Sequence, residues 1–86
     1  MPRISQYYGI AIYIYFRDHA PPHFHAIYGE HEATFEIATG KVMDGELPKR
    51  ARKLVVEWAK AHGAELQANW QRAQAGEALE PIEPLE

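Results

Sequence analysis

Three histidines lie close together in the first half of the chain, at His19, His23 and His25. His23 and His25 are two residues apart, so on a strand both imidazoles would project from the same face. His19 precedes them across Pro21 and Pro22, which stiffen the connection. An imidazole can act as an acid, a base or a metal ligand near neutral pH. We therefore predict that these three histidines form the chemical site.

Two chemistries fit this cluster. In the first, His19, His23 and His25 bind a divalent transition metal such as zinc, nickel or copper, with Asp18 or Glu36 as an oxygen ligand or supporting acceptor. The spacing H-x3-H-x-H matches no strong metal signature. In the second, one imidazole deprotonates a ribose hydroxyl and another protonates the leaving oxygen, which would cleave RNA without a metal. Both remain open, and the sequence does not decide whether the protein is an enzyme.

The first half of the chain has the period-two pattern and the β-branched and aromatic residues of strands. The predicted strands cover residues 10–16, 24–28, 32–37 and 41–43, and residues 18–22 form a loop. A two-residue turn at Gly29-Glu30 would pair Phe24 with Phe35 on the core face and His25 with Thr34 on the other face. The same register places His23 opposite Glu36.

The first strand adds to both faces of this sheet. Ile10, Ile12, Ile14 and Phe16 are predicted to join the core face. Tyr13 and Tyr15 are predicted to lie beside the histidines as a stacking platform for bases. Exposed strand faces also carry tyrosine and threonine from β-propensity alone, so this pattern has a purely structural alternative.

The second half changes to the helical period of 3.6. Ala51, Leu54, Val55, Trp58 and Ala59 form one apolar stripe, and a second stripe follows Gly63. We therefore predict an α+β fold: a small antiparallel sheet of three to four strands followed by two helices packed on one face. Residues 1–86 form a single domain, with a sheet half at 1–46, a helical half at 47–76 and an extended tail at 77–86. Both tryptophans should be buried.

Charge is unevenly distributed along the 86 residues, whose net charge is −3. Residues 47–62 carry five basic residues and only Glu57 as an acidic one. A basic helix face could meet phosphate, or it could be an ordinary solvated surface. The candidate substrate-binding residues are Tyr13, Tyr15, Arg17, Lys49, Arg50, Arg52 and Lys53.

The chain contains no cysteine, which excludes disulfides, thiolate metal sites and cysteine nucleophiles. The longest apolar stretch, residues 10–16, is far shorter than a membrane span requires. We therefore expect no membrane association and a cytoplasmic location. Association into a homo-oligomer is compatible with the sequence.

Several short motifs together resemble a known family. They are Tyr8-Gly9-Ile10, Phe16-Arg17-Asp18-His19, Pro22-His23-Phe24-His25-Ala26, Leu47-Pro48 and Asn69-Trp70. The run from Ile4 to Leu85 is similar to the bacterial domain of unknown function 4160. The resemblance implies a small stand-alone protein, often encoded beside a second small protein, as in toxin–antitoxin pairs. It implies no chemistry.

Two functions follow as hypotheses. The first is a toxin–antitoxin-type component that acts on RNA, with His23 and His25 transferring protons and the basic helix guiding phosphate. The second is a noncatalytic module that binds a protein partner or a small ligand, with a bound metal as one version. The partner in either case could be the small protein encoded by the neighbouring gene.

Overall fold

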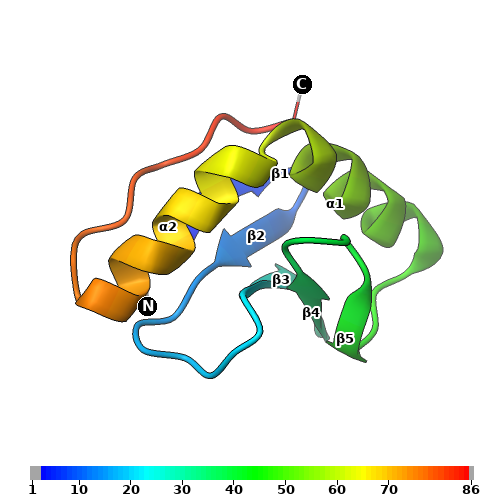
Figure 1. Ribbon diagram of the computed structural model, residues 1–86. Coiled ribbons are helices and arrows are strands. Elements are labelled where there is room, and N and C mark those ends of the chain that lie inside the picture. Colours follow the sequence, from blue (N-terminus) through cyan, green and yellow to red (C-terminus); the bar gives the residue numbers. More distant parts are fainter. Residues whose placement is uncertain (1–2, 86) are drawn as a thin grey trace.

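The computed structural model describes residues 3–85 and contains a five-stranded sheet followed by two helices (Figure 1). The strands are β1 Arg3–Tyr7, β2 Ile10–Tyr13, β3 His23–Tyr28, β4 His31–Glu36 and β5 Val42–Gly45. The helices are α1 Lys49–Ala61 and α2 Gly63–Ala75. Among the described residues, neither helix has the length and apolar character needed to cross a membrane.

All neighbouring strands are antiparallel, and their order in the sheet is the order in the chain. The α+β architecture is confirmed, but the prediction of three to four strands was wrong. The missed strand is β1, where Ser5 and Gln6 interrupt any clear apolar run. It pairs with β2 through a two-residue turn at Tyr8 and Gly9.

The predicted register of the central hairpin is confirmed. Phe24 pairs with Phe35, His25 with Thr34, and His23 with Glu36. The alternation of side chains then places Phe24 and His25 on opposite faces of β3.

The strand that carries Tyr13 is shorter than predicted. β2 ends at Tyr13, which pairs with His25. The chain then turns away toward α2, and Phe16 is 48% exposed. The prediction that Phe16 joins the core was therefore wrong. Ile14 lies beyond the strand but is still fully buried.

Both helices lie on the same side of the sheet (Figure 1). The indole of Trp58 in α1 packs edge-on against Phe24 of β3, with ring centroids 5.9 Å apart. Trp58 and Trp70 are both buried, as predicted. Gly63 begins α2 directly after the break at His62, so it separates two helices.

Residues 77–85 form neither helix nor strand, but they are attached to the rest of the fold. The Ile82 amide donates to the carbonyl of Ile4 in β1, at 2.8 Å. The Trp58 indole N–H donates to the carbonyl of Glu83, also at 2.8 Å. The tail therefore runs beside β1 and across the end of α1.

Candidate functional site

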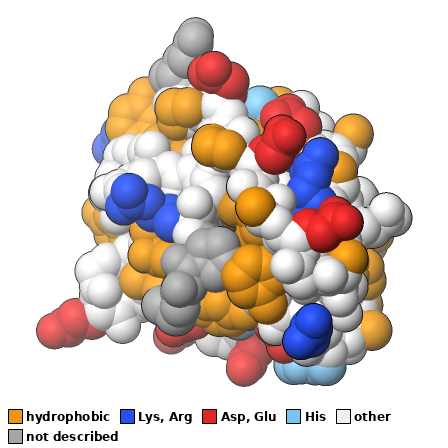
Figure 2. Space-filling view, turned by 90° about the vertical axis from the view of Figure 1, so that its left-hand side faces the viewer, with side chains coloured by type: hydrophobic (Ala, Val, Ile, Leu, Met, Phe, Trp, Pro, Cys, Tyr) orange, Lys and Arg blue, Asp and Glu red, His pale blue; other side chains and the backbone are white. Residues whose placement is uncertain are grey.

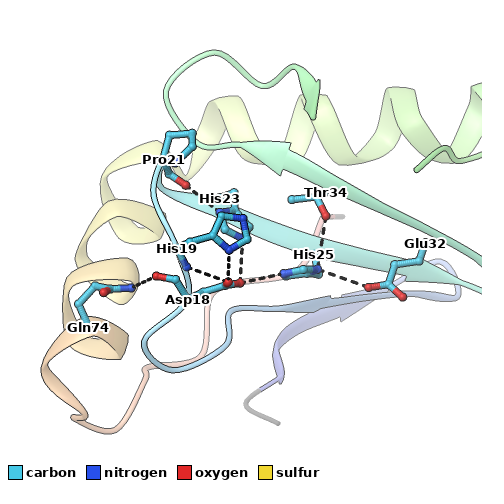
Figure 3. A network of polar contacts seen from close by, with 8 residues as sticks. All are labelled: Asp18, His19, Pro21, His23, His25, Glu32, Thr34 and Gln74. Atoms are coloured by element: carbon cyan, nitrogen blue, oxygen red, sulfur yellow. Dashed lines mark hydrogen bonds and ion pairs between the residues drawn. The ribbon is translucent and has the colours of Figure 1, made fainter. Parts of the chain in front are cut away.

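One carboxylate joins the predicted histidines. Asp18 Oδ2 lies 2.8 Å from Nε2 of His23 and 3.3 Å from Nε2 of His25 (Figure 3). The ligand atoms of these three residues all lie within 4.8 Å of one another. The two histidines come from β3 and the aspartate from the loop that precedes it. Asp18 is thus the centre of the site, a role that sequence reasoning left open between Asp18 and Glu36.

The end of α2 holds the loop that carries Asp18. The backbone amide of Arg17 donates to the carbonyl of Ala73, at 3.2 Å. The side-chain amide of Gln74 donates to the carbonyl of Asp18, at 3.0 Å (Figure 3). Two contacts on one helical turn therefore fix the direction from which the carboxylate approaches β3.

His23 is fully enclosed, with an exposed fraction of 1%. Its Nδ1 lies 2.7 Å from the carbonyl oxygen of Pro21, and its Nε2 faces Asp18. Its ring also packs against Trp70, with centroids 5.1 Å apart. A neutral imidazole has one N–H, so it can donate to only one of two oxygen acceptors. The contact at the other ring nitrogen therefore requires either a second proton on the ring or a metal ion bound to that nitrogen.

His25 is more accessible, with 15% of its side chain exposed. Its Nδ1 lies 3.4 Å from Oε2 of Glu32 and 3.5 Å from the hydroxyl of Thr34. Two carboxylates, those of Asp18 and Glu32, therefore approach His25. Glu32 is paired with Ile27 in the strand register, but the long side chain of Glu32 reaches diagonally to His25.

Glu36 is not the charge partner of His23, although the predicted register correctly places the two residues opposite each other. Glu36 stands opposite His23 in the sheet, but its carboxylate accepts a hydrogen bond from the Thr39 hydroxyl instead. The carboxylate beside the His23 imidazole is that of Asp18. A contact across a loop of this kind leaves no signal in strand register.

Burial alone would raise the pKa of Asp18. The hydrogen bonds from the His19 backbone amide and from the rings of His25 and His23, with the positive charge available on His23, outweigh burial and hold that pKa at about 2. Asp18 is therefore an anion at neutral pH, available as an ion-pair partner or a metal ligand.

His19 lies at the rim. Its side chain is 81% exposed and its Nδ1 is 2.9 Å from Oδ1 of Asp18. It is not one of the three residues whose ligand atoms lie together, which are Asp18, His23 and His25, so His19 as a metal ligand stays a prediction. His19 instead contacts the oxygen of Asp18 that faces away from the other two rings.

The predicted binding residues fall into separate groups. Tyr15 lies against His25, with ring centroids 4.3 Å apart, and Tyr13 is 6.3 Å from Tyr15. The guanidinium of Arg17 is turned toward Gly76 at the end of α2, where a β-carbon would lie 3.0 Å from it. The aromatic side chains therefore border the site, whereas the Arg17 guanidinium reaches toward the helix end.

The basic residues of α1 are not part of this site. Lys49, Arg50, Arg52 and Lys53 are exposed on a helix whose buried side faces Phe24. Because His25 points away from Phe24, the sheet separates the basic helix from the exposed histidine face.

Comparison with known proteins gives a family. The model of the family described as domain of unknown function (DUF4160) matches residues 9–71, more than half of the chain. The chain belongs to this family. Comparisons with curated proteins and with solved structures returned no match.

The stretch that matches DUF4160 contains the whole convergent cluster and Glu32. It ends before Gln74, which supports the Asp18 loop, and before the tail that runs beside β1. The family description gives no activity, so the function must be argued from the geometry of Asp18, His23 and His25.

Proposed function

We propose that this protein binds a divalent transition-metal ion through Asp18 Oδ2, His23 Nε2 and His25 Nε2. The observation that carries the proposal is that one ligand atom from each of these three residues lies within 4.8 Å of the other two. Two ligands about 2.1 Å from the same ion stand about 3.0 Å apart at right angles and about 3.4 Å apart at the tetrahedral angle. The carboxylate oxygen lies 2.8 Å from one ring nitrogen and 3.3 Å from the other, close to this range.

The outer nitrogens of both rings support the same arrangement. Metal-binding imidazoles usually direct their second nitrogen at a carbonyl or a carboxylate, which fixes the tautomer. Nδ1 of His23 faces the Pro21 carbonyl, and Nδ1 of His25 lies near Glu32. Both Nε2 atoms are thereby left as the ligands, and both point at Asp18.

Two histidines and one carboxylate form a ligand set typical of iron(II) and zinc sites that keep positions free for water or substrate. An ion held here would lie next to Tyr15 and the partly exposed His25. Such an ion supplies Lewis-acid polarisation of a bound oxygen. The protein's own part is to fix three ligands on a rigid strand and a braced loop.

The test is titration of the purified protein with zinc(II) by calorimetry and with cobalt(II) by absorption spectroscopy. We expect one ion per chain, and we expect His25→Ala to weaken binding by about 100-fold. His25→Ala should change the melting temperature little, because its ring is partly exposed. His31→Ala is the matched control, since His31 is exposed on β4 outside the cluster. Equal binding by wild type and His25→Ala would contradict the proposal.

RNA binding, as in a toxin–antitoxin pair acting in the cytoplasm, is a second candidate. The row of Tyr13, Tyr15 and His25 favours it, because aromatic rings on an open sheet face can stack unpaired bases. A metal-free mechanism with two imidazoles has less support, since His23 is enclosed and both of its nitrogens are already engaged.

The RNA candidate makes its own prediction. Affinity for a single-stranded RNA should fall with salt. Because the sheet separates the basic helix from the aromatic row, neutralising Lys49, Arg50, Arg52 and Lys53 together should weaken binding only if the RNA also wraps around to α1. Filter binding at several salt concentrations measures both effects, with and without the small protein encoded by the neighbouring gene. Tight binding that is indifferent to salt would exclude a role for the basic helix.

A further inference from the structure

A separate hollow lies at the opposite end of the β2–β3 pair from the histidines. It has a volume of about 310 Å³ and lies between the β1–β2 turn and the first turns of α1. Ile10 and Tyr28 form the strand pair beneath it, whereas Tyr13 and His25 form the pair at the other end. The hollow is therefore distinct from the candidate metal site.

The floor of this hollow is apolar. Ile10 and Ala51 are almost completely buried, and Leu54 packs against the core from α1. The size suits a single ring with a short substituent, near the lower limit of small-ligand pockets.

Two tyrosines border the hollow, and one of them is held in an unfavourable backbone conformation. Tyr8 has φ +48° and Gly9 has φ +78°, as the two central residues of a tight hairpin turn require. Asparagine, aspartate or glycine fits the first of these positions much better than tyrosine. Tyr8 gains no core packing in return, since it is 60% exposed. The turn therefore carries an aromatic ring at a conformational cost that the fold itself does not explain.

The second ring is placed by the same turn. A β-carbon on Gly9 would lie 3.4 Å from Cε1 of Tyr28, so the Tyr28 ring lies directly beside the glycine. Tyr28 is 38% exposed. The two tyrosines thus offer partly exposed aromatic surface at the border of one small cavity.

The charged group at the hollow is Arg50. It is exposed in the first turn of α1 and forms no ion pair with any residue between 3 and 85. A guanidinium presents two parallel N–H groups that match one carboxylate. A single arginine also balances the single charge of a carboxylate, whereas a phosphate monoester carries nearly two negative charges.

We propose that this hollow binds a small aromatic carboxylate. The ring lies between Tyr8 and Tyr28 above the apolar floor, and the carboxylate pairs with Arg50. Offset stacking on tyrosine and burial of the ring supply the affinity, and the guanidinium selects the acid over neutral analogues.

The test compares phenylacetate with phenylacetamide, which has the same ring and no charge, by NMR titration of the whole chain. Phenylacetate should shift the amide signals of Gly9, Ala51 and Leu54 and bind at least about tenfold more tightly than the amide. Arg50→Gln should remove this preference. Arg52→Gln is the matched control, because Arg52 lies on the same helix but does not line the hollow. Equal affinity of the wild-type protein for acid and amide, or shifts elsewhere only, would overturn the proposal.

A second variant separates binding from folding. Tyr8→Asn places a favoured residue in the turn, so it should raise the melting temperature while weakening phenylacetate binding about tenfold or more. Because this variant is expected to be more stable, lost binding cannot be attributed to unfolding. Unchanged phenylacetate affinity in Tyr8→Asn would refute the role assigned to the tyrosine.

Discussion

His23 and His25 stand two residues apart on one strand, yet their surroundings give them different tasks. His23 is enclosed by Trp70 and contacts an oxygen atom at each nitrogen, so replacing it would remove a partner from both the Pro21 carbonyl and Asp18 Oδ2. His25 keeps part of its ring open to solvent beside Tyr15. The first residue organises the site and the second is the one that an incoming molecule can reach.

Tyr7 is a buried residue whose hydroxyl finds no hydrogen-bond partner among the described residues. Its ring packs on Trp58 with centroids 5.4 Å apart, and burial raises the pKa of its phenol. In the unfolded chain the phenol ionises near pH 10. As pH rises, the Tyr7 phenol therefore loses its proton in the unfolded state before it does so in the folded state. The free energy of unfolding should then fall as pH rises above about 10.

Tyr7→Phe removes both the unsatisfied hydroxyl and this ionisation. We expect it to be neutral or to stabilise the protein by up to about 1 kcal/mol at pH 7, and to reduce the loss of stability at high pH. Urea unfolding at pH 7, 10 and 11 measures both effects. Tyr8→Phe, at an exposed neighbour, should retain the wild-type pH dependence. A large destabilisation by Tyr7→Phe at pH 7 would mean that the hydroxyl has a partner after all.

Among the secondary-structure elements, the last turn of α2 has the clearest link to the site, because it holds the Asp18 loop from outside. Gln74→Ala removes the side-chain donor to the Asp18 carbonyl. Global stability should change by no more than about 0.5 kcal/mol, since Gln74 is exposed. Hydrogen exchange at the Arg17 amide should become faster, and zinc affinity should fall about tenfold if the metal proposal holds.

Gln71→Ala is the matched control for this prediction. Gln71 is also exposed on α2, but the described structure gives its side chain no hydrogen bond to the loop. Exchange at Arg17 should then match the wild type. If both variants behaved alike, the loop would be held by the Ala73 backbone contact alone.

The elements also differ in how well the sequence predicts them. Alternation and turn chemistry at Gly29 fixed the β3–β4 register, and the 3.6-residue period identified both helices. β1 lacked such a pattern, because polar residues occupy its centre. Asp18 could be named as a candidate, but its central position depends on α2, more than 50 residues later in the chain, and no local pattern encodes that contact.

At the scale of the whole molecule, two surface features matter: the distribution of charge and the two edges of the sheet. Basic and acidic side chains are interspersed with apolar ones on the face shown in Figure 2, with no broad area of one sign.

The tail lies along β1, the first edge of the sheet, and the Ile82 amide donates to the Ile4 carbonyl of that strand. β5 forms the other edge and is exposed throughout, including Val42 and Met43. The tail therefore protects one of two edges that could otherwise pair with another chain.

Asn69 attaches this tail to α2. It is 1% exposed, its side-chain N–H donates to the Glu80 carbonyl at 2.8 Å, and its side-chain oxygen accepts from the Glu80 amide at 2.9 Å and from Arg72 at 3.1 Å. Asn69→Ala leaves the two backbone groups of Glu80 without these partners. We expect a loss of about 2–4 kcal/mol in the free energy of unfolding, measured by urea denaturation.

The same variant tests whether the tail protects the β1 edge. If it does, the Ile82 amide should lose hydrogen-exchange protection in Asn69→Ala, and the variant should self-associate at high concentration while Gln71→Ala remains like the wild type. Ile4 and Trp58, which contact the tail directly, would then become more accessible to solvent. A loss of stability without faster exchange at Ile82 would show that Asn69 supports α2 itself and that the tail is held by Trp58 and Ile4.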